Sequence, residues 1–389
     1  MKKKICILTA TRAEYGLLRP IILKLMNVPE FDISVVVTGA HLSPEFGLTY
    51  KEIESDKITI SEKIEILLSA DTPAAISKSM GLAMIGFADY FARLNPDMLI
   101  VLGDRYETLA VCCAAMNQRI PIAHLYGGET TEGALDEAIR HAITKLSYLH
   151  FTSTEVYRRR VIQLGEQPNR VFCVGAIGIE NILTQKLLSK ADLAAAIHFS
   201  LDKPFAMVTF HPVTLEGNHS AVQFQELLHV CHNHSDMKFV FSKANADADG
   251  RIINQLLEAF VKENPNSVAF SSLGMINYLS ALKHCEMVIG NSSSGLVEAP
   301  SFGIPTINIG DRQKGRLQAD SVINCEPVSD QIEKAMSLAM SDTMKRRARM
   351  TINPYGDGNT SGKIVANIMD FLINNKIDIK KVFFDCEDR

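Results

Sequence analysis

Ionisable side chains follow directly after short hydrophobic runs at several points of this sequence. Asp104 follows the run 97–103, and Glu129 follows the run 120–126 after two glycines that let a ligand approach the backbone closely. Asp136 begins the next helical pattern. Clustered carboxylates raise one another's pKa, so these three groups, brought together, could take up and release protons as general acid and base.

Each of these carboxylates also has a purely structural alternative. Asp104 follows a glycine and could cap the next helix. Asp136 and Arg140 are four residues apart, so on a helix they share a face and could form an ordinary ion pair. The sequence alone leaves both alternatives open.

A second kind of motif suits an anion such as a diphosphate. Ser292 and Ser293 lie in a Gly/Ser loop between the run 286–290 and a helical pattern, where backbone N–H groups, hydroxyls and the helix dipole could bind it. Glu298, one turn into that helix, could reach a ribose diol, and Arg312 lies in a basic loop after the next run. A serine-rich turn without a ligand is the structural alternative. Neither a Walker A sequence nor G-x-G-x-x-G occurs.

Two arginines and a histidine also lie just after hydrophobic runs. Arg12 follows the first hydrophobic run, 4–10, and the helix that begins there contains Gly16. Arg105 stands beside Asp104, and His211 follows the first run of the second half. A histidine there could donate to a phosphate or protonate a leaving group, with a structural role as the alternative.

The elements that must position these residues alternate between short β-branched runs and longer helical patterns, which predicts βαβ units and parallel sheets. Strands are predicted at 4–10, 31–39, 97–103, 120–126, 149–153, 170–176, 205–210, 238–242, 267–272, 286–290, 305–310 and 321–325. Helices are predicted at 17–25, 73–93, 108–117, 136–146, 155–164, 221–231, 250–261, 276–284, 295–302, 330–340 and 361–375, with a helical connector at 177–201. In open parallel sheets the ligand lies outside the carboxyl ends of the strands, which is where the residues above fall.

We therefore predict an α/β protein made of two Rossmann-like doubly wound domains. Residues 1–178 form the first domain and 179–360 the second, which contains the serine-rich loop suited to a diphosphate. Residues 361–389 form a C-terminal helix and tail that could pack back on the first domain, with the last residues frayed.

Composition excludes several classes of protein. Forty Lys and Arg against forty-four Asp and Glu give a net charge of -4, so no global attraction to nucleic acid or anionic lipid is expected. No hydrophobic stretch approaches the ~20 residues that span a bilayer. The eight cysteines are scattered without a C-x-x-C pair, which favours the reducing cytoplasm. The spacing of His229, Cys231, His232 and His234 fits no common zinc pattern, so we expect no metal site.

The motifs TRAEYG, TGAH, VLGDRYE, HLYGGE, DEAIRHAITKLS, FHPVT, IGNSSSGLVEAPSFG and INIGDRQKGR occur in this order along nearly the whole chain. In this combination the chain resembles the hydrolysing UDP-N-acetylglucosamine 2-epimerases of sialic-acid-type sugar biosynthesis. The resemblance implies a GT-B-like fold in which residues 179–360 form the UDP-binding domain and a UDP-sugar lies in the central cleft. A homodimer or homotetramer is implied as well. It also implies a reaction without NAD or metal: UDP is eliminated across C1 and C2, and water adds to the 2-acetamidoglucal with inversion at C2.

The resemblance also implies a role for each matching residue. Asp104, Glu129 and Asp136 would be the acid/base set, and His211 would assist the departure of UDP. The remaining residues would bind the UDP-sugar: Arg12, Arg105, Ser292, Ser293 and Arg312 at the diphosphate, Glu298 at the ribose, His41 and Asn245 at the sugar or cleft, and Gly16 within the first motif. Many relatives carry Glu where this chain has Tyr126, so that role would pass to Glu129.

Other functions remain open at this point. A close variant would act on UDP-N,N'-diacetylbacillosamine, as in legionaminic acid pathways. A GT-B glycosyltransferase would need an acceptor and would not need the pair Asp104 and Asp136. A non-hydrolysing 2-epimerase would retain UDP on its product, and a nucleotide-sugar-binding regulator would show no turnover.

Overall fold

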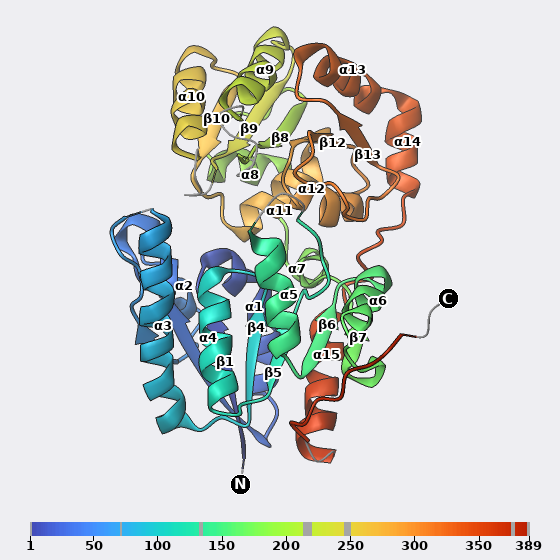
Figure 1. Ribbon diagram of the computed structural model, residues 1–389. Coiled ribbons are helices and arrows are strands. Elements are labelled where there is room, and N and C mark those ends of the chain that lie inside the picture. Colours follow the sequence, from blue (N-terminus) through green and yellow to red (C-terminus); the bar gives the residue numbers. More distant parts are fainter. Residues whose placement is uncertain are drawn as a thin grey trace. The chain divides into compact units, whose positions relative to one another are not determined.

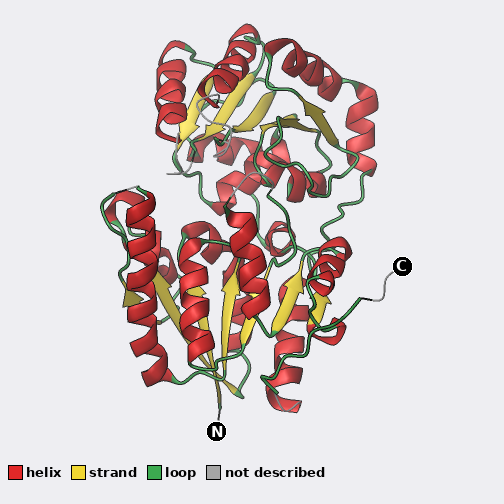
Figure 2. Ribbon diagram, in the orientation of Figure 1, coloured by secondary structure: helices red, strands yellow, loops and turns green. Residues whose placement is uncertain are grey.

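The computed structural model of this chain describes residues 2–70, 72–131, 135–212, 220–244, 250–374 and 378–386. The chain forms two compact units: Met1–Glu129, Leu135–Asn181 and Tyr355–Arg389 make up the first, and Thr130–Ala134 and Ile182–Pro354 the second. Each unit is built on a parallel sheet covered by helices (Figures 1 and 2). The predicted fold class, two Rossmann-like doubly wound units of the GT-B kind, is confirmed.

The first unit contains a seven-stranded sheet in the order β3-β2-β1-β4-β5-β6-β7, with every neighbouring pair parallel. Its strands are β1 (Lys3–Thr9), β2 (Phe31–Thr38), β3 (Ile60–Ile64), β4 (Met98–Leu102), β5 (Ile122–Leu125), β6 (Leu149–Thr152) and β7 (Val171–Cys173). All five residues of β4 are buried, as expected of a central strand covered on both faces.

Helices cover both faces of this sheet. The helices of the first unit are α1 (Arg12–Met26), α2 (Tyr50–Ser55), α3 (Pro73–Leu94), α4 (Tyr106–Asn117), α5 (Asp136–Leu146), α6 (Glu155–Gln163) and α15 (Thr360–Met369), with α7 (Ile177–Thr184) at the boundary of the units. Short 3-10 turns occupy Gly39–Leu42, Pro44–Phe46 and Pro168–Arg170, and a π-helical turn, Asp370–Asn374, extends α15. Helices α3, α4 and α5 line one face side by side, and α15 lies against α1 (Figure 1).

The second unit contains a six-stranded parallel sheet in the order β10-β9-β8-β11-β12-β13. Its strands are β8 (Phe205–Thr209), β9 (Lys238–Ser242), β10 (Ser267–Phe270), β11 (Met287–Gly290), β12 (Thr306–Ile309) and β13 (Val322–Cys325). Its helices are α8 (Lys190–Ala196), α9 (Ser220–Asn233), α10 (Gly250–Glu263), α11 (Met275–His284), α12 (Ser294–Val297), α13 (Ser329–Met340) and α14 (Asp342–Met350), with a 3-10 turn at Ala299–Phe302.

Both sheets share one topological feature that bears on function. The strand order reverses between β1 and β4 in the first sheet, and between β8 and β11 in the second. Chains leaving two such strands turn to opposite faces, which leaves room for a ligand outside their carboxyl ends. Asp104 follows β4, His211 follows β8 and Asn291 follows β11, so candidate residues lie at both switch points.

The structure confirms all twelve predicted strands and corrects several other predictions. Strand β3 and helices α2 and α14 were not predicted, and the predicted helix 295–302 consists of α12 followed by a 3-10 turn. The prediction of a frayed tail at 381–389 is wrong for residues 381–386. The backbone N–H of Phe384 donates to the carbonyl of Gly165 at 3.0 Å, and Lys381 lies 2.7 Å from the buried carboxylate of Glu166. Among the described residues, no helix has the length and hydrophobicity needed to cross a membrane.

Candidate active site

Three segments of the first unit meet at the guanidinium of Arg140. This side chain lies on α5 and is almost fully buried. It donates to the carboxylate of Asp104, to Oε2 of Glu137 at 2.7 Å, and to the backbone carbonyl of Glu129 at 2.8 Å. The structure therefore brings Asp104 and the backbone of Glu129 to one point. The alternative of Asp104 as a helix cap is wrong, because Arg105 holds the cap position of α4.

Asp136 stands one turn before Arg140, at the first residue of α5. Burial raises the pKa of its carboxyl, and the negative charge of Asp104 raises it further. Asp104, by contrast, is ion-paired with Arg140. Two carboxyl groups in environments this different suit the two roles of proton donor and proton acceptor.

Glu129 is held by its side chain as well as its backbone. The hydroxyl of Ser153, a buried residue directly after β6, donates to Oε1 of Glu129 at 2.7 Å. The preceding Gly128 has a φ of 78°, and a Cβ there would approach the carbonyl oxygen of Tyr157 to 2.4 Å. Only glycine fits this turn, so the direction of the Glu129 side chain is fixed by the fold.

A buried histidine supports the turn that presents Asp104. Nε2 of His124 donates to the carbonyl of Gly103 at 2.8 Å, and Thr144 of α5 faces its Nδ1 at 3.4 Å. Burial lowers the pKa of His124 to about 3, so the ring is neutral near pH 7 and can make this bond without a buried charge.

The two arginines predicted to hold the diphosphate from the first unit both pair with carboxylates. Nε of Arg12 lies 2.7 Å from Glu52. Nε of Arg105 donates to Glu107 at 2.7 Å and lies 4.0 Å from Glu14. Burial, opposed by Arg105 and assisted by the charge of Glu107, raises the pKa of Glu14 to about 7. A diphosphate at either arginine would have to compete with these carboxylates.

His41 and Gly16 occupy structural positions in the first unit. The ring of His41 is fully buried, with Nε2 2.9 Å from the hydroxyl of Thr9 and Nδ1 2.9 Å from that of Thr49. Burial lowers its pKa to about 4. The carbonyl of Gly16 accepts from the side chain of Asn181 at 3.0 Å. These contacts explain both residues by packing and hydrogen bonding within the unit.

In the second unit, Asn291 joins two of the candidate segments. Its Oδ1 accepts from the backbone N–H of His211 at 2.7 Å, and its Nδ2 donates to the carbonyl of His211 at 2.8 Å. Its own carbonyl accepts from Arg312 at 3.2 Å and from the side chain of Gln313 at 2.8 Å. The structure therefore brings His211 and Arg312 together at the switch point between β8 and β11.

The imidazole of His211 is buried at this point. Burial, and then the charge of Arg312, lower its pKa to about 3. Its Nδ1 has no hydrogen-bond partner among the described residues. A neutral ring can still donate one N–H to a phosphate oxygen, and a nearby dianion would favour the protonated form.

The serine-rich loop leads into a shorter helix than predicted, because α12 comprises only Ser294–Val297. The dipole of one turn contributes little, so Ser292 and Ser293 would bind an anion mainly through hydroxyl and backbone N–H groups. Glu298 follows this turn, and burial raises its pKa. The hydroxyl of Tyr278 donates to Ser294 at 2.6 Å and steadies the turn. Asn245 lies outside the described residues.

Sequence reasoning missed the residues that hold the candidate carboxylates in place. Ser153 is the last residue of the predicted strand 149–153 and directly follows the observed strand β6, so attention to the carboxyl ends of strands could have selected it too. The local i,i+4 spacing pairs Arg140 with Asp136 and gives no sign of the longer contact to Asp104. Asn291 stands beside the serines of the same loop, and its residue type alone does not indicate that it joins two segments.

Tyr126 has a structural role. Its hydroxyl accepts from the backbone N–H of Ile177 at 2.8 Å, and its ring packs against the core of the first unit. We expect Tyr126→Phe to lower the free energy of unfolding by about 1 kcal/mol through this lost bond. The turnover number should not change, as steady-state kinetics beside thermal unfolding would show. A loss of turnover without a loss of stability would instead place Tyr126 in the chemistry.

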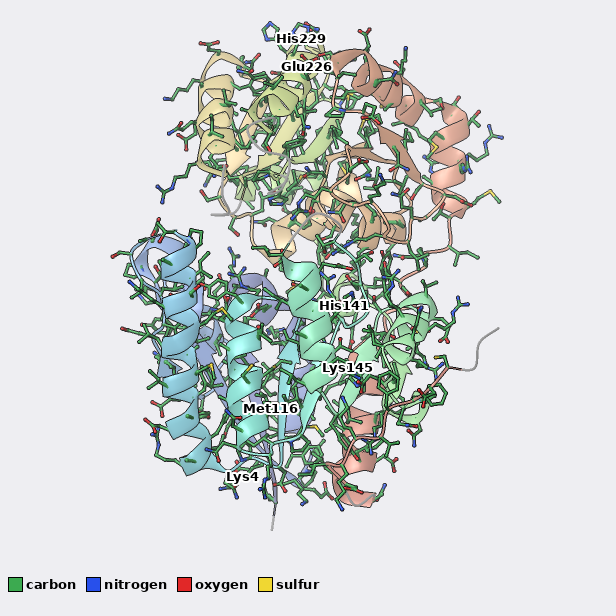
Figure 3. The ribbon with its side chains drawn as sticks, in the orientation of Figure 1. Lys4, Met116, His141, Lys145, Glu226 and His229 are labelled. Atoms are coloured by element: carbon green, nitrogen blue, oxygen red, sulfur yellow. The ribbon has the colours of Figure 1, made fainter. Side chains whose placement is uncertain are left out.

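The histidine-rich end of α9 does not form a metal cluster. Nδ1 of His232 lies 2.7 Å from Asn264, and Nε2 of His234 lies 2.9 Å from Glu333. His229 stands on the outer surface of α9 near Glu226 (Figure 3). Within the described part of the chain, no three His, Cys, Asp or Glu side chains are placed to hold a metal ion.

Comparison with known proteins identifies the family. A family model described as UDP-N-acetylglucosamine 2-epimerase matches residues 23–369. The "GDP/UDP-N,N'-diacetylbacillosamine 2-epimerase (hydrolyzing)" of Campylobacter jejuni is 45% identical over 326 residues, covering 84% of this chain and 85% of that protein. Polysialic acid biosynthesis protein P7 of Escherichia coli is 38% identical over 384 residues, covering 98% and 97%. The "UDP-N,N'-diacetylbacillosamine 2-epimerase (hydrolyzing)" of Legionella pneumophila is 34% identical over 361 residues, covering 93% and 94%.

Solved structures share the fold. The UDP-GlcNAc 2-epimerase of Neisseria meningitidis bound to UDP-GlcNAc superposes with a TM-score of 0.81 at 18% identity, covering 94% of this chain and 100% of that one. The enzyme of Methanocaldococcus jannaschii in complex with UDP-GlcNAc and UDP gives 0.78 at 20% identity, covering 94% and 99%. With a family match over most of its length and relatives well above 30% identity, the chain belongs to the UDP-N-acetylglucosamine 2-epimerase family.

Proposed function

We propose that this chain is a hydrolysing 2-epimerase that acts on a UDP-linked 2-acetamido sugar without NAD or a metal ion. The observation that carries the proposal is the meeting of Asp104, Glu129 and Asp136 near one buried guanidinium. The relatives at 45% and 34% identity, both named as hydrolysing 2-epimerases, support the reaction type.

The chemistry that such an enzyme must perform fits these residues. The hydrogen on C2 of the sugar is barely acidic, so cleavage of the C1–O bond must run ahead of proton removal. Carboxylates stabilise the oxocarbenium character that this leaves at C1. UDP leaves with its electron pair, the C2 proton goes to one carboxylate, and the product is a 2-acetamidoglucal.

Water then adds at C1 while a proton returns to C2 from the opposite face. Inversion therefore requires two groups, one accepting and one donating a proton. Asp104, ion-paired with Arg140, suits the acceptor, and Asp136, whose pKa is raised, suits the donor. His211 and Arg312, which Asn291 holds together, would stabilise the charge of the departing diphosphate.

The relatives favour a specific second candidate for the sugar. Two of them are named for N,N'-diacetylbacillosamine, and one of these names includes the GDP-linked as well as the UDP-linked form. The candidate substrates are therefore UDP-N-acetylglucosamine and this 2,4-diacetamido sugar, linked to UDP or to GDP.

The test is NMR of product formation in deuterated water with each candidate donor and no acceptor. We expect release of free UDP, a free sugar with inverted C2, and one solvent deuterium at that carbon. EDTA should leave the rate unchanged. Competition between the two donors at equal concentration would identify the preferred sugar, and a GDP-linked donor would test the choice of nucleotide.

Each competing function gives a different result. Epimerised product that still carries UDP would indicate a non-hydrolysing enzyme, and a requirement for an acceptor would indicate a glycosyltransferase. Binding of every donor without turnover would leave only a nucleotide-sugar-binding regulator. Any of the three would overturn the proposal.

A further inference from the structure

One buried guanidinium connects all the segments that carry the candidate acid/base groups. We propose that Arg140 is a positioning residue that holds Asp104 and the Glu129 turn in one catalytic arrangement. This inference rests on the proposed function, because that function assigns the acid/base roles to these carboxylates. Arg140 itself acts through these groups and need not touch the substrate.

The geometry requires an arginine rather than another cation. Three acceptors of Arg140 come from the loop after β4 (Asp104), the turn after β5 (the carbonyl of Glu129) and the second residue of α5 (Glu137). A planar guanidinium with five N–H donors can satisfy acceptors from several directions at once. A lysine ammonium keeps the positive charge but cannot direct N–H donors toward acceptors on several segments at once.

The helix that carries Arg140 is itself anchored. The hydroxyl of Thr144 donates to the carbonyl of Arg140 at 3.0 Å and also faces His124. Lys145 of α5 donates to the buried carboxylate of Glu166 at 2.6 Å. Lys145 and His141, one turn before it, are labelled along α5 in Figure 3. Because these contacts hold α5 beyond Arg140, the guanidinium keeps its position and can hold the loops that carry Asp104 and Glu129.

The charge of Arg140 also acts on Asp136. The groups facing Asp136 are Asp104, whose charge raises its pKa, and Arg140 and Arg105, which lower it. Glu137 faces Arg140 and also accepts from His141 at 3.2 Å. Removing the positive charge of Arg140 should therefore raise the pKa of Asp136 further, while replacing it by lysine should not.

The experiment compares Arg140→Gln with Arg140→Lys. Misplacing acid/base groups by about 1 Å costs roughly 100-fold in rate, so both variants should lose about 100-fold in kcat with little change in KM. In Arg140→Gln alone, the limb of the pH–rate profile that reports Asp136 should move to higher pH. Adding Arg140→Gln to Asp104→Asn should cost little more than Asp104→Asn alone, because the two residues act through one contact.

The matched control is Arg158→Gln. Arg158 is another arginine of the first unit, partly exposed where Arg140 is buried, and it donates to the carbonyls of Val171 at 2.8 Å and Pro168 at 3.2 Å. It makes the same kind of backbone contacts away from the three carboxylates, so its loss should leave kcat unchanged. Full kcat in Arg140→Lys, or an unmoved pH profile in Arg140→Gln, would overturn the proposal.

Two further measurements keep the test decisive. If Arg140→Gln does not fold, Glu137→Ala removes one acceptor and leaves the guanidinium, and it should lower kcat by about 10-fold, because a charge-assisted hydrogen bond of about 1.5 kcal/mol is lost. A carbon-13 NMR titration of the Asp136 carboxyl needs no substrate. A donor screen without turnover would therefore overturn the proposed function, while an Asp136 titration that is identical in Arg140→Gln and wild type would overturn the role of Arg140.

Discussion

Asp104→Asn should lower the rate of UDP release by about 10²- to 10⁴-fold, the usual contribution of a general acid or base. The amide can still accept a bond from Arg140, so the loop should keep its position, but it can neither carry the negative charge nor take a proton. The proposed diphosphate ligands His211 and Arg312 belong to the second unit. UDP affinity, measured by calorimetry, should therefore be unchanged.

The same strand offers a matched control for this variant. Asp97 directly precedes β4 and is paired with Lys3 at 2.9 Å, whereas Asp104 follows β4 and is paired with Arg140. Both are partly exposed, ion-paired aspartates at opposite ends of one strand. Asp97→Asn should keep the full rate of UDP release. Wild-type activity in Asp104→Asn would remove this residue from the acid/base set.

Gly290→Ala should have the largest effect on stability. Gly290 ends β11 with a φ of 132°, and a Cβ there would lie 1.9 Å from the carbonyl oxygen of Thr209 on the neighbouring strand β8. That carbonyl accepts the N–H of Asn291 at 3.1 Å. Strain and overpacking each cost about 1–3 kcal/mol, so the free energy of unfolding should fall by about 2–6 kcal/mol.

A second glycine separates steric overlap from backbone strain. Gly310 follows β12 in the same sheet with a φ of 70°, but a Cβ there would meet nothing within 4 Å. Gly310→Ala should cost about 1–2 kcal/mol, the price of a left-handed alanine alone. Chemical denaturation of both variants would compare them, with UDP binding as a second readout that only Gly290→Ala should lose. Equal losses of stability would show that the contact with Thr209 is not what excludes a side chain.

The sequence predicts the fold well where strands are hydrophobic on both faces. All twelve predicted runs are strands, and a central one such as β4, buried along its whole length, shows no alternation of polar residues that could be mistaken for another element. The missed strand β3 reads ISEKI and is only partly buried, so its polar positions conceal it. The missed helix α14 reads DTMKRRARM and buries only Met344 and Ala348, which is too narrow a stripe to stand out.

The position of the candidate site can be predicted from the sequence, but the contacts between its side chains cannot. Carboxyl ends of parallel strands meet at one edge, so the residue types and the strand pattern together select Asp104, Glu129 and His211. What the pattern cannot supply is which partner each side chain takes. Arg140 has Asp136 four residues away on its own helix, yet it pairs with Asp104, because the packing of α5 against the loop after β4 decides between them.

The order of the segments along the chain sets a condition on how the protein is made. Helix α15 lies against α1, and Ile364 and Ile368 of α15 belong to the same core as Leu18 of α1. Yet the whole of Ile182–Pro354 comes between these two parts of the first unit. During synthesis the N-terminal segments emerge first, so the apolar face of α1 must wait for the entire second unit to be translated. A nascent chain stopped before Tyr355 would leave uncovered the part of α1 that contacts α15 in the complete unit.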